Sequence, residues 1–221
     1  MSLTINWPKS RSRPLAEVAA QGPSAPERLH AAAQRGDAKA VNDVLAAGVD
    51  VDAKDARGQT ALLMAVQGGH TSIARTLMER GASVNAQAGN QDTPWLLAGA
   101  SGRTEILELM LSRRPDLTIR NRFGGNALIP ACERAHVETV RLLTSKSKID
   151  VNHVNNLSWT CLLEIVILGD GGPRHVEVTK LVLAAGANPN IADRDGVSPL
   201  RHARQRNQRD VAALIEAAGG R

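Results

Sequence analysis

The stretch RGQTALLMAVQGGH at residues 57–70 returns as NQDTPWLLAGASGR at 90–103 and as FGGNALIPACERAH at 123–136. Two further copies, LSWTCLLEIVIL and DGVSPLRHARQRNQ, stand at 157–168 and 195–208. Self-similarity at a fixed period of roughly 20–50 residues is the mark of a repeat architecture. This recurrence therefore predicts one supersecondary unit that is repeated along the chain.

Each copy carries one residue that suits the N-terminal cap of a helix. These residues are Thr60, Thr93, Asn126, Thr160 and Ser198, with spacings of 33, 33, 34 and 38 residues. Pro94 and Pro199 follow their caps directly, at the first helical position, where the missing N–H of proline is tolerated. A sixth unit begins with PERLHAAAQRGD at 26–37 and places Glu27, a poorer cap, 33 residues upstream of Thr60.

Each unit also carries the signals of a second helix and of a protruding loop. In the copy at 57–70, Gly69 predicts a break after the first helix, and the apolar pair Leu77 and Met78 indicates a second one. Gly81 then predicts a left-handed helix end, and ASVNAQA at 82–88 an extended turn. A unit of this size cannot bury its apolar face alone, so the units must stack on one another.

These motifs resemble the ankyrin repeat, whose T-P-L-H-x-A signature stands here in degenerate form as TALLMA, TPWLLA, NALIPA, TCLLEI and SPLRHA. The resemblance covers roughly residues 25–219 and implies an all-α solenoid of about six helix-turn-helix repeats with protruding β-hairpin-like loops. The expected repeats are 25–54, 55–87, 88–120, 121–154, 155–192 and 193–219. A mostly extended leader is expected at 1–24. The segment from Arg122 to Gly172 is also similar to a group of uncharacterised bacterial ankyrin-repeat proteins, which implies a prokaryotic origin.

Composition narrows the function classes. Hydrophobic residues make up 43% of the 221 residues, but with one Phe, three Trp and no Tyr, the core must be built from Ala, Leu and Val. The net charge of +5 is mixed in sign along the chain and forms no basic block, so a nucleic-acid partner is not expected. No apolar run is long enough to span a membrane or to serve as a signal peptide, and we expect a cytoplasmic monomer. Cys132 and Cys161 are too few for a disulfide framework and are expected to fill small gaps between helices.

The candidate binding site is taken from departures from the plain repeat, which concentrate in repeats 4 and 5. As implied by the resemblance, the function is recognition of a partner protein in the concave groove, without catalysis or a cofactor. Phe123 and Trp159 fall at groove-facing positions of adjacent repeats, either as apolar anchors or packed on each other. A five-residue excess within 169–174 forms an expected rim. The predicted partner-binding residues are Arg122, Phe123, Glu133, Arg134, Trp159 and Asp170.

Other features of the sequence bear on alternative functions. Glu164 lies within an apolar run, where a carboxylate needs a partner, and we expect it to accept backbone hydrogen bonds from the neighbouring loop. No nucleophile, metal set or cofactor motif accompanies Glu133 and Glu164, which argues against an enzyme. The arginines of the last repeat fit a polar cap of the array better than a polyanion site. The alternative that stays open is a receptor for a small ligand or peptide end, built from the repeat 4–5 pocket and the inserted loop 169–174.

Overall fold

The structure is a computed structural model that describes residues 22–221. The leader expected at 1–24 therefore lies outside the described residues, except for its last three. Helices alternate with loops throughout residues 22–221, and no strand occurs there. The helices are α1 Ala25–Arg35, α2 Ala38–Ala46, α3 Ala61–Gly68, α4 Thr71–Glu79, α5 Pro94–Ala100, α6 Thr104–Leu111, α7 Leu128–Glu133, α8 Val137–Lys146, α9 Cys161–Leu168, α10 Pro173–Ala184, α11 Pro199–Gln205 and α12 Arg209–Ala217.

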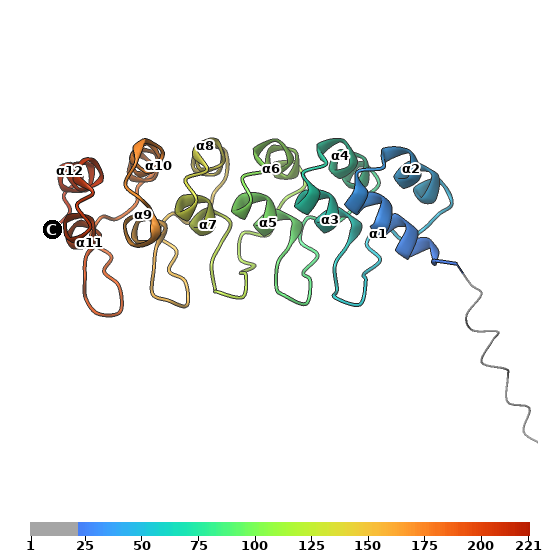
Figure 1. Cartoon of the computed structure of the whole chain (residues 1–221), viewed down its shortest axis with the longest axis horizontal. Helices are drawn as coiled ribbons and strands as arrows, with labels where there is room; N and C mark the ends of the chain where they lie inside the picture. The colour runs from blue at the N-terminus through green and yellow to red at the C-terminus, as the bar shows by residue number, and fades with distance from the viewer. Residues whose placement is uncertain (1–21) are drawn as a thin grey trace, which may run out of the picture.

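The helices stack as six antiparallel pairs along one direction, as Figure 1 shows. The first helices of the pairs form one row and the second helices form another (Figure 1). The connections between successive pairs, here called finger loops, project beyond the row of first helices (Figure 1). Contacts run mainly within a pair and between neighbouring pairs. The predicted all-α ankyrin-like solenoid is confirmed.

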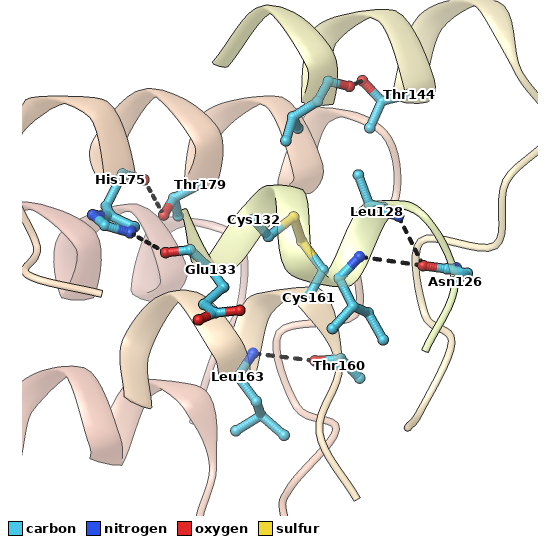
Figure 2. Close-up of a disulfide and its surroundings, with 12 residues drawn as sticks. Asn126, Leu128, Cys132, Glu133, Thr144, Thr160, Cys161, Leu163, His175 and Thr179 are labelled. Atoms are coloured by element: carbon cyan, nitrogen blue, oxygen red, sulfur yellow. Dashed lines mark hydrogen bonds between the residues drawn. A yellow bond between two sulfur atoms is a disulfide. The ribbon is translucent and has the colours of Figure 1, made fainter. Parts of the chain in front are cut away.

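The predicted caps begin the first helices. The Thr60 and Thr160 hydroxyls accept hydrogen bonds from the third backbone N–H of α3 and α9, at 3.3 and 3.2 Å. Asn126 caps α7 through its side-chain oxygen, which accepts from the backbone N–H groups of Leu128 and Ile129 at 3.0 and 3.2 Å (Figure 2). Side-chain oxygens at these positions satisfy N–H groups that the helix itself cannot.

The first helix departs from the predicted register. Glu27 is not its cap. Ser24 occupies that position, and its hydroxyl accepts a hydrogen bond from the Glu27 backbone N–H at 3.4 Å. The Glu27 carboxylate in turn accepts from the Ser24 backbone N–H at 2.7 Å, which completes a capping box. The Ser24 backbone N–H and hydroxyl both donate to the Glu27 carboxylate, and these two hydrogen bonds hold the pKa of Glu27 below its ordinary value.

Replacing Ser24 with alanine is expected to destabilise α1 by about 1 kcal/mol, because the capping hydroxyl is lost. Since terminal units of an array open locally, the change should appear as roughly fivefold faster amide hydrogen exchange in α1. Ser72→Ala is the matched control, because Ser72 is exposed on α4 and its side chain makes no hydrogen bond within residues 22–221. Equal exchange in the two variants would contradict the capping role of Ser24.

The core lies between neighbouring helix pairs. The first helices of the four inner pairs, α3, α5, α7 and α9, are therefore buried over most of their residues. In α9, all six residues from Cys161 to Val166 are buried, including one carboxylate. Trp95 on α5 is 2% exposed and belongs to this core. Gly99 permits the closest approach: a Cβ there would lie 2.6 Å from the backbone oxygen of Ala127. The stacked helices α5 and α7 therefore depend on a residue without a side chain at that point.

The finger loops share one hydrogen-bond pattern. In the loop before α7, the Asn121 N–H donates to the Gly125 oxygen at 3.0 Å, and in the loop before α9 the Asn155 N–H donates to the Trp159 oxygen at the same distance. The two loops are also joined, because the Asn156 N–H donates to the Phe123 oxygen at 2.9 Å. Neighbouring fingers are therefore held together at their tips.

The excess residues of the fifth pair are shared between a linker and a helix. Helix α9 ends at Leu168 and α10 begins at Pro173, so the linker has four residues, where the linker between α3 and α4 has two. Helix α10 is 12 residues long, against 9 in α4 and 10 in α8. The excess predicted within 169–174 thus lengthens the second helix as well as the turn.

Cys132 and Cys161 were predicted to fill small gaps between helices, and this prediction is wrong because the two residues are bonded to each other. Cys132 of α7 and Cys161 of α9 form a disulfide, with their Cα atoms 5.6 Å apart (Figure 2). Both residues are fully buried. Stacking of α7 on α9 brings together two positions that are 29 residues apart in the sequence.

None of the helices in residues 22–221 is long and apolar enough to cross a membrane.

Candidate functional site

A hollow of about 350 Å³ lies between the finger loops that precede α7 and α9 and the exposed sides of these two helices. We call it the α7–α9 groove. Five of the six predicted partner-binding residues line it, namely Arg122, Phe123, Glu133, Arg134 and Trp159. The sixth, Asp170, lies outside its lining, as does the rest of the linker 169–172. The ligand receptor considered above would need this linker at the pocket, and the structure offers no support for that arrangement.

Apolar side chains are unusually exposed around this groove. Phe123, Leu157 and Leu168 are 52%, 42% and 50% exposed, and all three line the groove. Val154, at 43%, is the remaining large hydrophobic residue of comparable exposure within residues 22–221, and it lies on the same finger loop as Leu157 but outside the groove. Clustered apolar exposure on a folded surface marks an interaction site more often than scattered exposure does.

Sequence reasoning missed Leu157 and Leu168, although the repeat register carried a signal for both. Leu157 stands three residues before its cap, the place that Phe123 occupies in the preceding unit. The other units have polar residues there: Arg57, Asn90 and Asp195. Leu168 stands eight residues after its cap, where the other units have Gly68, Ser101, Arg134 and Arg206. Comparing each repeat position across the units would have identified the two leucines.

Glu164 forms the buried polar part of the groove. It is only 5% exposed, and its Oε1 accepts a hydrogen bond from the side-chain amide of Asn155 at 3.0 Å. The Asn155 oxygen accepts from the backbone N–H groups of Leu157 and Trp159, at 2.9 and 3.0 Å. Glu164 therefore holds the finger loop, but through the Asn155 side chain and not by the direct backbone hydrogen bonds that were predicted.

The electrostatic environment of Glu164 disfavours its charged form. Burial, together with the nearby carboxylate of Glu133, raises the pKa of Glu164 to about 7, against the opposing effects of the Asn155 amide and of Arg134. Figure 2 shows the Glu133 side chain extending from α7 towards α9. Within residues 22–221, neither Glu133 nor Glu164 forms an ion pair. The groove thus contains two neighbouring carboxyl groups that form no ion pair with a basic side chain of residues 22–221.

The two arginines of the groove are engaged elsewhere. Arg134 donates from Nη1 to the backbone oxygen of Ala100, at the C-terminal end of α5, at 2.6 Å. The Arg122 guanidinium lies over the Phe123 ring, 4.6 Å from its centroid, in a cation–π contact. Burial raises the pKa of Asp92 above its ordinary value, and the positive charge of Arg122 partly offsets this rise. Both guanidinium groups therefore have partners other than the groove carboxylates.

Asp170 organises the linker behind the groove. Its Oδ1 accepts hydrogen bonds from the Gly172 N–H at 2.8 Å and meets the Nδ1 atom of His175 at 2.7 Å. These two contacts lower the pKa of Asp170. The other ring nitrogen of His175 lies 3.0 Å from the backbone oxygen of Glu133 (Figure 2). Asp170 is therefore connected to the groove through His175 and the end of α7.

Comparison with known proteins gives a consistent result. The family model for ankyrin repeats in three copies matches residues 29–121 and 96–193. The Escherichia coli (strain K12) protein YahD, which is named as an ankyrin repeat protein, is 37% identical over 188 residues, covering 85% of this chain and 94% of YahD. The crystal structure of an ankyrin repeat domain from Acinetobacter baumannii AYE is 47% identical, with a TM-score of 0.83 over 87% of this chain and 98% of that domain. The ankyrin repeat protein EF0377 is 37% identical, with the same TM-score, over 86% of this chain and 97% of its own.

Proposed function

The chain belongs to the ankyrin-repeat family, whose members are in general protein-interaction modules, and on that premise we propose that it binds a partner protein through the α7–α9 groove without catalysing a reaction. One observation carries the choice of this groove. Three of the four most exposed large hydrophobic residues within 22–221 line it. Apolar residues that water would otherwise surround gain most from burial in an interface.

The architecture suits such a role energetically. Phe123, Leu157 and Leu168 supply apolar anchors on two finger loops and one helix, and Trp159 supplies the half-buried wall between them. The finger tips are joined by the Asn156–Phe123 hydrogen bond, so the anchors are arranged before a partner arrives. A preformed surface loses less conformational entropy on binding. In this proposal Arg122, Glu133 and Arg134 give polar specificity, and Asp170 acts from behind by holding the linker.

The test is capture of partners from a lysate of the source organism by the purified chain and by the triple variant Phe123→Ala/Leu157→Ala/Leu168→Ala. We expect the wild type to retain a protein that the triple variant loses, with affinity reduced at least about tenfold, because several anchors are removed together. Trp159 is left in place, since it is partly buried and its removal would disturb the fold.

Val154→Ala is the matched control. Val154 is as exposed as Leu157 and lies on the same finger loop, but it does not line the groove. It should bind the partner like the wild type, and thermal unfolding should show all three proteins folded. If the triple variant retains every protein that the wild type retains, the groove is not the binding surface.

We also propose that the chain acts in the cytoplasm as a monomer. The cytoplasmic location needs a direct test because the chain has a disulfide, and structural disulfides persist in oxidising compartments and are rare in the cytosol. Fractionation of the source cells should place the chain with cytoplasmic markers. Recovery from an oxidising compartment would reject this location and leave the proposal about the groove intact.

A further inference from the structure

We propose that the α7–α9 groove receives a lysine or arginine side chain of the partner protein, with its cationic head beside Glu133 and Glu164 and its aliphatic stem against Trp159 and Leu168. This inference rests on the proposed function and specifies the chemistry of the partner. It is carried by the unpaired carboxyl groups, the directions taken by the neighbouring arginines, and the size and apolar walls of the groove.

The first step is that one oxygen of the largely buried Glu164 carboxyl group has no hydrogen-bond partner within residues 22–221 and remains accessible to solvent. Glu164 is only 5% exposed, yet it belongs to the lining of the groove. Its Oε1 is used by Asn155, while Oε2 accepts no hydrogen bond from any residue within 22–221. A carboxylate at such a position is costly unless it is paired and hydrogen-bonded. A donor that enters from the groove would supply what the fold does not.

The second step is that the chain's own cations do not fill this place. Arg134 is bonded to the Ala100 oxygen, and Arg122 lies over the Phe123 ring. Glu133 adds a second negative group from α7 and accepts no ion pair within the described residues. Burial and the neighbouring Glu133 both oppose a negative charge on Glu164, and both therefore raise its pKa. A cation placed between the two carboxyl groups would offset both effects.

The third step concerns the rest of the ligand. The groove of about 350 Å³ lies at the low end of the range typical for sites that enclose whole small molecules. Trp159, Leu157 and Leu168 present apolar surface along it. Lysine and arginine combine an aliphatic stem that packs on such surface with a charged head that seeks a polar partner. A negatively charged or purely apolar side chain would leave the carboxyl groups unpaired.

The charge of the whole chain does not by itself favour a basic partner, because it is +5. Exposed charges more than about 10 Å apart are largely screened at physiological salt, whereas partly buried groups are screened much less. The attraction is therefore local to the two carboxyl groups and should select one basic position in a ligand and not a generally basic protein.

The experiment is selection of peptides from a random twelve-residue display library on the folded full chain. Selection is repeated on Phe123→Ala/Leu157→Ala/Leu168→Ala, on Glu133→Gln/Glu164→Gln, on Glu164→Gln alone, and on Glu105→Gln. Glu105→Gln makes the same charge change as Glu164→Gln, at an exposed residue of α6 outside the groove. We expect wild type and Glu105→Gln to enrich peptides that carry Lys or Arg at one fixed position beside apolar residues. The affinity of such a peptide should fall about tenfold or more in Glu164→Gln.

A double-mutant cycle then assigns the contact. Replacing the selected Lys or Arg by Met should weaken binding to the wild type and cause little further loss in Glu133→Gln/Glu164→Gln, because the same interaction has already been removed. Peptides that need the apolar anchors but show no basic position, or that bind the double glutamine variant equally well, would overturn this inference while leaving the groove proposal standing. If no peptide depends on the apolar anchors, both proposals fail.

Discussion

Replacing both Cys132 and Cys161 with alanine is expected to lower the free energy of unfolding by about 3–4 kcal/mol. The disulfide closes a loop of about 30 residues, and in the chain-entropy model a loop of that size restricts the unfolded chain by this amount. Both cysteines are fully buried on stacked helices, so the folded state already holds them together and gains little from the covalent bond itself. Urea unfolding of the two proteins under oxidising conditions measures the difference.

Reductant provides the control for this prediction. Adding dithiothreitol should lower the stability of the wild type almost to that of Cys132→Ala/Cys161→Ala and leave the variant unchanged. The triple variant in Phe123, Leu157 and Leu168 retains both cysteines and should respond to reductant as the wild type does. A wild type whose unfolding midpoint is the same with and without reductant would show that the bond does not restrain the chain in solution.

The second large effect is a pH dependence that belongs to Glu164. Its pKa is about 7 in the folded state and 4.5 ordinarily, so below pH 4.5 the group is protonated in both folded and unfolded chains. Between pH 4.5 and 7 the unfolded chain releases this proton while the folded chain keeps it, and stability falls as pH rises. Above pH 7 the loss is complete. The full difference corresponds to about 3 kcal/mol.

Glu164→Gln should remove this dependence, because glutamine does not titrate and its side-chain oxygen can still accept from Asn155. We expect the variant and the wild type to be equally stable near pH 4.5, and the variant to be more stable by up to about 3 kcal/mol at pH 8. Glu133→Gln should lower the pKa of Glu164 in the folded state, since Glu133 raises it, and should therefore lower the upper limit of the pH range over which stability falls. Parallel stability curves for wild type and Glu164→Gln would contradict the assignment.

Much of the fold was predictable because the repeat register expresses local chemistry. The caps at Thr60, Thr93, Asn126, Thr160 and Ser198 need only a side-chain oxygen at the right place, and the sequence shows it directly. The first cap was misplaced because the period was extended to Glu27, whereas the local pattern of Ser24 followed by Glu27 is itself a capping box. Local sequence information was stronger there than the count of residues.

The candidate site was less predictable, because it depends on contacts between different repeats. Register placed Phe123 and Trp159 at one groove, but it does not reveal that Cys132 and Cys161 meet, since they occupy different positions in their own units. Their contact arises only when α7 and α9 stack on each other. Similarly, Asp170 was expected at the rim from its place in an insertion, and its orientation towards His175 follows from how α10 begins.

The neighbour-to-neighbour character of the contacts has a consequence for how such genes change. Each helix pair packs mainly on the pairs immediately before and after it, and the units recur at about 33 residues. An in-frame duplication or deletion of that many codons within the first two units would join a capped helix to an equivalent finger loop. The helix pairs on either side of the junction would then pack through the same kind of surface as before. Because α7 and α9 lie outside those units, the groove between them would keep its own lining after such a change.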